Sequence, residues 1–343
     1  MTKIFVRRGT ESGSGADIIF EAGKNLETGE RSFIDNFGSV TTLESDLLLV
    51  AASILAADRI VPRGEREDYI SRGFDMSIPV VNIGRLQPLI TSIERTLRTL
   101  SCDSWKISFR QADGRQEQYR DAPKRASKGR TLLFSGGLDS LAAAFELGTS
   151  KANFQLVSHI TRNQQTKSAQ KKLVDLLKAK GISAPHLQFF VSSRDGQPSP
   201  GYQHDAENSQ RTRSFVFLFL GALAARRAGH SDLLMLAENG QMAIHLPLSE
   251  ARIGAFSTHT AYPEVLVRME TLLKQALQYE LILRNPYVSM TKAEVIRKLV
   301  KTFPGAIPIS TSCWRNTRLP ASATHCGACV PCMVRRVAIE FHG

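Results

Sequence analysis

The sequence predicts an α/β protein built on a doubly wound parallel sheet. After residue 130, short apolar strands alternate with helices, and the first of these strands runs directly into a Gly-Gly turn and a helix start. Strands separated by helical crossovers form parallel sheets with helices on both faces. The first third of the chain has strand and helix patterns of its own, which predicts a smaller α/β domain ahead of the main sheet.

This N-terminal domain is expected at residues 1–115. Its helix at 44–60 has apolar residues at helical spacing and is followed by Pro62, a residue that ends helices. The expected elements, in order, are strands at Lys3–Arg8 and Ala16–Phe20, a helix at Glu44–Ile60, a strand at Phe74–Val81, a helix at Leu86–Leu100 and a strand at Trp105–Phe109. A polar stretch punctuated by Gly and Pro then predicts a linker at 116–129.

The main domain is expected at residues 130–310, where strands and helices alternate strictly. We expect strands at Thr131–Phe134, Phe154–Ile160, Leu187–Val191, Asp232–Leu236 and Leu281–Leu283, and helices at Asp139–Leu147, Ser168–Lys180, Arg213–Arg227, Glu264–Tyr279 and Lys292–Lys301. In such sheets, ligands bind outside the carboxyl ends of the strands. Residues 311–343 are expected to form a metal-binding C-terminal segment.

The composition is that of an ordinary globular protein, with 343 residues, of which 42% are hydrophobic and 22% charged. No apolar run approaches the roughly 20 residues of a membrane helix, and the N-terminus does not resemble a signal peptide. We therefore expect a cytoplasmic protein without a membrane partner. The net charge of +12 favours polyanions. Because the basic residues are scattered, nucleic acid is a possible but not the favoured partner. The sequence leaves open whether the protein forms an oligomer.

The segment Ser135-Gly136-Gly137-Leu138-Asp139-Ser140 predicts a phosphate-binding loop. Paired glycines let the backbone approach an anion closely, and the amides of the first helical turn point at the bound group. Ser135 and Ser140 would add hydroxyl donors, and Asp139 would hold Mg²⁺ against phosphate oxygens. The competing interpretation is a structural strand-to-helix turn with a serine cap.

Four of the five cysteines, Cys313, Cys326, Cys329 and Cys332, lie close to the C-terminus. Thiolates at these spacings can close a tetrahedral site around Zn²⁺, whereas disulfides are disfavoured in the cytosol. Four protein ligands leave no open position, so the zinc is expected to be structural. His325 is an alternative ligand beside them.

The loop resembles the PP-loop of the ATP pyrophosphatases, which cleave ATP between the α- and β-phosphates and transfer AMP to a substrate oxygen. The tail from Thr311 to Arg335 is similar to the end of the 7-cyano-7-deazaguanine synthase (QueC) family. Segments at 210–215, 262–264 and 290–295 resemble further family segments in the same order. The resemblance spans about 130–340 and implies the fold of the adenine nucleotide α-hydrolases.

The resemblance also implies residue roles. The six residues of the loop match the family's pyrophosphate and Mg²⁺ site, and the four tail cysteines match its zinc ligands. Arg213 matches a basic residue near the nucleotide or substrate, and Lys292 matches a lysine that faces phosphate. Asp139, Arg213 and Lys292 are therefore the expected catalytic residues. The alternative is that Arg213 is a surface arginine at a helix end and that Lys292 is a solvated lysine. The implied cofactors are ATP, Mg²⁺ and Zn²⁺.

Three departures from the family pattern are visible. The loop after the second strand reads Ser158–Gln165 in place of Tyr-Gly-Gln-x-His, Glu238-Asn239-Gly240 follows the fourth strand, and residues 1–115 are absent from the housekeeping enzyme. QueC-like proteins with such features resemble those of bacterial anti-phage operons, including the type IV CBASS and Qat groups.

The implied reaction is adenylation of the carboxylate of 7-carboxy-7-deazaguanine, followed by attack of an amine. We expect a protein acceptor encoded nearby, conjugated to deazaguanine in anti-phage defence, and recognition of that acceptor by residues 1–115. The alternatives are synthesis of the nitrile preQ0 from ammonia and modification of tRNA. Thiolation is disfavoured, since Cys102 alone remains outside the tail. Residues 1–115 could instead cover a sheet edge or form a dimer contact.

Overall fold

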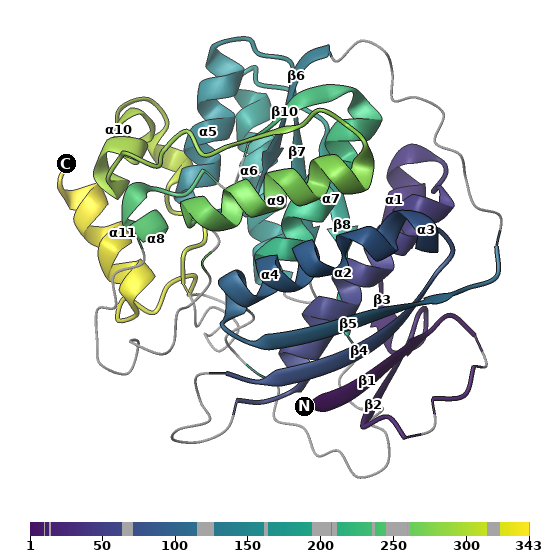
Figure 1. Ribbon diagram of the computed structural model, residues 1–343. Helices are drawn as coiled ribbons and strands as arrows, with labels where there is room; N and C mark the ends of the chain where they lie inside the picture. The colour runs from purple at the N-terminus through teal and green to yellow at the C-terminus, as the bar shows by residue number, and fades with distance from the viewer. Residues whose placement is uncertain are drawn as a thin grey trace.

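The computed structural model describes residues 1–9, 11–13, 15–63, 71–114, 127–160, 164–193, 207, 211–234, 237–244, 259, 261–313 and 323–342. Two parallel sheets face each other across a double layer of helices (Figure 1). Among the described helices, none has both the length and the apolar character needed to span a membrane.

The N-terminal region forms a four-stranded sheet in the order β2-β1-β4-β5, with every neighbouring pair parallel. Its strands are β1 (Thr2–Arg7), β2 (Ile18–Glu21), β4 (Gly73–Val80) and β5 (Ser104–Gln111), and its helices are α1 (Glu30–Phe37), α2 (Thr42–Ile60), α3 (Ile83–Leu86) and α4 (Ile90–Ser101). A capping box starts α2, in which the Thr41 and Glu44 side chains each accept a backbone N–H of the other.

The second sheet has five parallel strands in the order β11-β10-β6-β7-β8. They are β6 (Ser127–Leu133), β7 (Phe154–Ile160), β8 (His186–Phe190), β10 (His230–Leu234) and β11 (Ile282–Arg284). The chain builds outward from β6 to β8 and then returns to add β10 and β11 on the other side. The strand order therefore reverses between β6 and β10, which confirms a doubly wound sheet.

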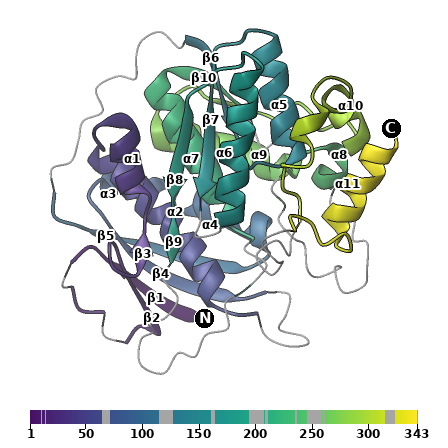
Figure 2. The same cartoon turned by 180° about the vertical axis from the view of Figure 1, so that it is seen from behind.

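Helices cover both faces of this second sheet (Figure 2). One face carries α5 (Leu138–Thr149) and α6 (Gln164–Ala179), with α10 (Lys292–Thr302) and α11 (Val330–Glu340) packed outside α5. The other face carries α7 (Arg213–Ala228) and α9 (Pro263–Leu277), while the short α8 (Gly240–Ile244) follows β10. In this arrangement α7 and α9 also contact α2 and α4 of the N-terminal region.

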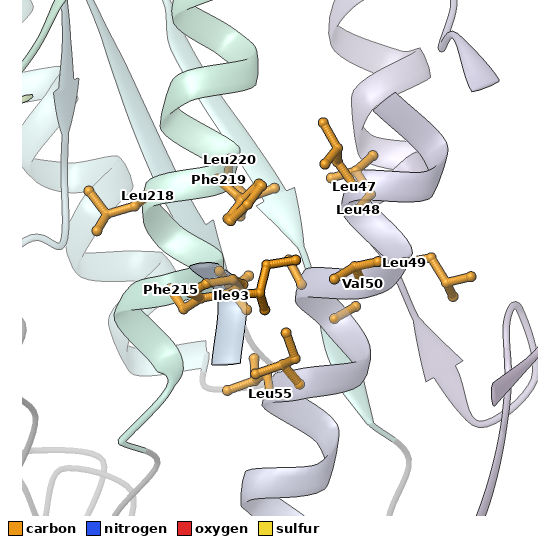
Figure 3. Packing of buried hydrophobic residues seen from close by; sticks show 14 of the residues in the cluster. Leu47, Leu48, Leu49, Val50, Leu55, Ile93, Phe215, Leu218, Phe219 and Leu220 are labelled. Carbon is orange, nitrogen blue, oxygen red and sulfur yellow. The ribbon is translucent and has the colours of Figure 1, made fainter. Parts of the chain in front are cut away.

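α2 and α7 pack side by side in opposite directions and place leucine and phenylalanine side chains at the centre of the largest described core (Figure 3). Glu44 in the first turn of α2 pairs with Arg227 in the last turn of α7, at an N···O distance of 2.5 Å. At the opposite ends, Asp58 of α2 accepts hydrogen bonds from Thr212, immediately before α7. The two sheets therefore share one continuous apolar core.

The N-terminal region also covers the outer edge of β8. Ser32 Oγ accepts the Phe190 N–H at 3.1 Å, and Asn36 Nδ2 donates to the Gln188 carbonyl at 3.4 Å. Directly after β8, the short strand β9 (Ser192–Ser193) pairs antiparallel with β3 (Leu26–Glu27). Edge strands left open promote aggregation, so this cover protects the sheet. The acceptor-recognition role of residues 1–115 stays a prediction.

The strands and helices expected from the sequence are present, with ends that shift by a few residues. One difference is the start of β6, because Ser127 pairs with His230 of β10 and thus lies in a strand rather than in the expected linker. Residues 115–126 lie outside the described residues. The helices α1, α8 and α11 and the strands β3 and β9 were not expected.

Candidate functional site

The predicted loop lies between β6 and α5. Gly136 has a φ of +83°, which a residue without Cβ adopts without strain. The Ser140 hydroxyl donates to the Gly137 carbonyl at 3.0 Å. Its proton is thereby used, so in the 3.3 Å contact between the two serines Ser135 Oγ is the donor. Ser135 Oγ also accepts the Gly137 N–H at 3.3 Å. Gly137 supplies no side-chain cap for α5, which leaves the amides of the first helical turn available to an anion.

Two side chains and one backbone N–H from three other segments hold the backbone around this loop. Gln170 Nε2 donates to the Ser135 carbonyl at 3.2 Å, and the Thr311 N–H donates to the Gly136 carbonyl at 2.9 Å. The Ser158 hydroxyl donates to the Phe134 carbonyl at 2.6 Å. The loop is thus fixed in position before any ligand binds.

Asp139, in the first turn of α5, is the centre of a polar cluster. Its side chain is buried, with Oδ1 2.7 Å from Lys292 Nζ at the start of α10 and Oδ2 accepting from Asn239 Nδ2 at 2.9 Å. Asn239 follows β10, and the adjacent Gly240 N–H donates to the Met290 carbonyl at 2.8 Å. The cluster therefore lies between the carboxyl ends of β6 and β10, where the strand order reverses.

Glu238 adds a second carboxyl group to this cluster. Burial, and then the negative charge of Asp139, raise the pKa of Glu238 to about 7, while Lys292 acts in the opposite direction. Two carboxyl groups beside a lysine and a helix N-terminus form an arrangement suited to a cation and a phosphate together.

Arg213 lies apart from this cluster. It is the first residue of α7, its side chain is exposed, and it makes no hydrogen bond or ion pair with any described residue. Close by, burial and the positive charge of Arg213 lower the pKa of His159 to about 4, so His159 is neutral and its Nε2–H donates to the Val191 carbonyl at 2.9 Å. Arg213 therefore lies near the carboxyl end of β7, along the same sheet edge as the loop.

The four tail cysteines come together. The sulfurs of Cys313, Cys326, Cys329 and Cys332 all lie within 4.8 Å of one another. The backbone N–H of Cys326 donates to the Cys313 sulfur and that of Cys329 to the Cys326 sulfur, both at 3.4 Å. Backbone N–H groups, that of Ala328 first, lower the pKa of the Cys326 thiol to about 6.

The donor set of this cysteine cluster fits zinc. Zn–S bonds of about 2.3 Å in a tetrahedron require sulfurs about 3.8 Å apart, and the Cys313 and Cys329 sulfurs are 4.0 Å apart. Among the described residues, His325 is not part of this group of ligand atoms. The cluster could thus bind zinc through four thiolates.

Sequence analysis assigned no role in the site to three residues that surround the loop, namely Gln170, Asn239 and Thr311. Gln170 and Thr311 bind loop carbonyls, and Asn239 binds Asp139. A signal was present for Asn239, because it follows the strand next to β6 at the switch point. No comparable signal marks Gln170, which lies within a predicted helix.

Comparison with known proteins gives two matches. Residues 232–343, which include the cysteine cluster and Lys292, match the family model "Queuosine biosynthesis protein QueC". The 7-cyano-7-deazaguanine synthase 1 of Mesorhizobium japonicum is 26% identical over 230 residues, which are 62% of this chain and 89% of that protein. Both matches support a likeness of this chain to QueC proteins. The expected association with anti-phage operons stays a prediction.

Proposed function

We propose that the chain uses ATP to adenylate the carboxylate of 7-carboxy-7-deazaguanine and then passes the acyl group to an amine. The observation that carries this proposal is Asp139, held between Lys292 and Asn239 beside the available amides of α5. An adenylating enzyme must stabilise pyrophosphate as it leaves, and this loop concentrates N–H donors, hydroxyl donors and a lysine at one point. The two QueC-like matches support a deazaguanine substrate.

The reaction has two balanced steps. A carboxylate oxygen of the substrate attacks the α-phosphorus, the bond from that phosphorus to the bridging oxygen breaks, and pyrophosphate leaves. The amine then attacks the acyl carbon, AMP leaves, and the amine nitrogen loses a proton. In the first step the loop amides with Ser135 and Ser140 bind the pyrophosphate oxygens, and Arg213 orients the substrate carboxylate from the edge near β7.

The residues present fit Mg²⁺, since Asp139 and Glu238 bring carboxylate oxygens to a site built for phosphate. Mg²⁺ held there would neutralise charge on the phosphates. In the structure Lys292 pairs with Asp139. We infer that Lys292 moves from this carboxylate to a phosphate oxygen when the nucleotide binds.

The proposed acceptor is a protein amine, and conjugation in anti-phage defence is the corresponding role. A protein acceptor is supported by the coverage of the match to the synthase, which is 89% of that protein but only 62% of this chain. This chain therefore has a large additional part that synthesis of a nitrile from ammonia would not require. Ammonia and tRNA remain the alternative acceptors, and the experiment below separates them.

The test is to incubate the purified protein with ATP, Mg²⁺ and 7-carboxy-7-deazaguanine, and to measure pyrophosphate exchange into ATP. We expect exchange that requires the deazaguanine, and AMP as the nucleotide product. Mass spectrometry with ammonia, tRNA or a co-encoded protein then identifies the acceptor from the mass of the product. Formation of ADP and orthophosphate would contradict the proposal.

A further inference from the structure

A buried polar contact joins the N-terminal region to the start of α7. Asp58, near the C-terminal end of α2, and Thr212, directly before α7, are both fully buried. One carboxylate oxygen of Asp58 accepts the Thr212 backbone N–H at 2.7 Å and the Thr212 hydroxyl at 2.9 Å. Two donors of one residue thus converge on one oxygen, which fixes both the position and the orientation of Thr212.

Asp58 is itself held by a network of buried charges. Arg72 pairs with its other carboxylate oxygen and donates to its carbonyl oxygen at 2.9 Å. Arg72 also pairs with Asp103 at 2.8 Å, and Arg63 binds both oxygens of Asp103 at 2.8 Å. Buried charges that are paired in this way are costly to separate, so Asp58 has little freedom to move. These four charged residues all belong to the N-terminal region.

The residue that follows Thr212 is Arg213. Because helices that follow parallel strands start at the carboxyl edge of the sheet, the first turn of α7 lies along the edge that carries the loop. The Arg213 side chain is exposed there and has no described ion-pair partner to hold it. The region that it can reach therefore depends on the position of the first turn, which Asp58 holds through Thr212.

We propose that Asp58 is a positioning residue, which fixes the first turn of α7 so that Arg213 faces the substrate carboxylate. The N-terminal region is then part of the framework of the active site. This inference rests on the proposed function for the role of Arg213, but the restraint on α7 can be tested without activity.

The test compares two substitutions, each of a residue that hydrogen-bonds to a buried carboxylate of α2, near opposite ends of that helix. Thr212→Val removes the hydroxyl bonded to Asp58 and keeps the backbone N–H. The matched control is Asn82→Ala, because Asn82 likewise gives its backbone N–H and its side-chain N–H to one oxygen of a buried α2 carboxylate, Asp46, both at 2.8 Å. Thr212→Ser, which restores the hydroxyl, is the rescue variant, and Thr212→Ala replaces Thr212→Val if the latter does not fold.

Two measurements are made on each variant. In Thr212→Val we expect faster hydrogen exchange in the first turn of α7, and a loss of about tenfold in kcat/KM for 7-carboxy-7-deazaguanine with the KM for ATP unchanged. Thr212→Ser should restore both values, and Asn82→Ala should change neither. Hydrogen exchange and kcat/KM in Thr212→Val equal to those of Asn82→Ala would overturn the inference.

If the unmodified protein shows no pyrophosphate exchange that requires deazaguanine, the proposed function fails, but the inference about Asp58 does not. Amide hydrogen exchange alone then decides whether Asp58 restrains α7. Faster exchange in Thr212→Val than in Asn82→Ala supports the restraint by Asp58, and equal exchange refutes it.

Discussion

The backbone N–H of Thr311 donates a 2.9 Å hydrogen bond to the carbonyl of Gly136, and thereby joins the tail to the loop. Cys313 follows Thr311 by two residues. Arg335 of α11 holds the same segment through Ser310 Oγ at 2.7 Å and through a backbone carbonyl. A metal bound by the cysteine cluster would therefore support the loop as well as the tail.

Replacing Cys329 by Ala should remove zinc and weaken nucleotide binding. An incomplete shell of three thiolates binds metal less tightly, and we expect the free energy of unfolding to fall by more than about 3 kcal/mol. Metal analysis, thermal unfolding and ATP titration measure the three effects. Cys102→Ser is the control, because Cys102 lies outside the cluster. A zinc-free preparation of the unmodified protein with normal stability would contradict the prediction.

Replacing Lys292 by Met should lower the rate of pyrophosphate exchange by about a hundredfold or more, because the lysine stabilises charge on the leaving group. Lys298→Met is the matched control on the same helix, since Lys298 is exposed and pairs only loosely with Glu146, at 3.6 Å. Asp139→Ala should abolish exchange altogether. Equal rates for the two lysine variants would show that Lys292 does not act on the leaving group.

The substitution Gly136→Ala should destabilise the protein by about 1–2 kcal/mol, because Ala is strained at positive φ. The added Cβ would also lie 3.1 Å from Gln170 Cγ, whose amide holds the loop. At Gly137, φ is −82° and the closest atoms to a new Cβ are 3.4 Å away. Chemical denaturation should therefore show a smaller loss for Gly137→Ala, and the reverse order would contradict the structure.

The pKa of Glu238 leads to a prediction about stability and pH. Because the folded protein raises this pKa from 4.5 to about 7, it holds the proton that the unfolded chain releases between these values. The free energy of unfolding therefore falls as pH rises from 4.5 to 7. Glu238→Gln should remove this fall and stabilise the ligand-free protein at pH 8 by about 2 kcal/mol, but not at pH 4. Denaturation curves at both pH values check the difference.

A truncated chain that begins at Ser127 should not fold. It would expose the face of α7 that packs on α2, including Phe215 and Phe219, and would open the edge of β8. We expect insoluble protein, or protein that melts without cooperativity in calorimetry. A soluble fragment with a sharp transition would show that residues 127–343 are independent, and would make residues 1–115 a separable module.

The fully buried elements were the most predictable from the sequence. The strand Phe154–Ile160 was expected with its observed ends, because four of its residues, Phe154, Leu156, Val157 and Ile160, are apolar and the strand is buried on both faces. The helix α1 was missed although Phe33 and Phe37 are at helical spacing, because it has only eight residues, of which Phe33 alone is buried. The helix α11 was missed because a metal site and a proline, Pro331, dominate the sequence at its start.

Local sequence patterns marked the loop and the four tail cysteines, and the family resemblance added Lys292. Ser135 to Ser140 are contiguous, and their chemistry is visible in the order of the residues. The contact of Asn239 with Asp139 joins positions 100 residues apart, and that of Gln170 with Ser135 joins positions 35 apart. Such contacts depend on the order of the strands in the sheet, which local sequence patterns do not specify.

The burial of α2 has a consequence for synthesis of the chain on the ribosome. Its residues from Leu43 to Asp58 are all buried, and α7, which covers one side of α2, begins only at Arg213. At about 5–20 residues per second, α2 leaves the ribosome roughly 10–30 s before α7. During that interval the side of α2 that packs on α7 is exposed on the nascent chain, where a chaperone for apolar segments can bind it. Translation speed between these two helices thus becomes a determinant of the yield of native protein.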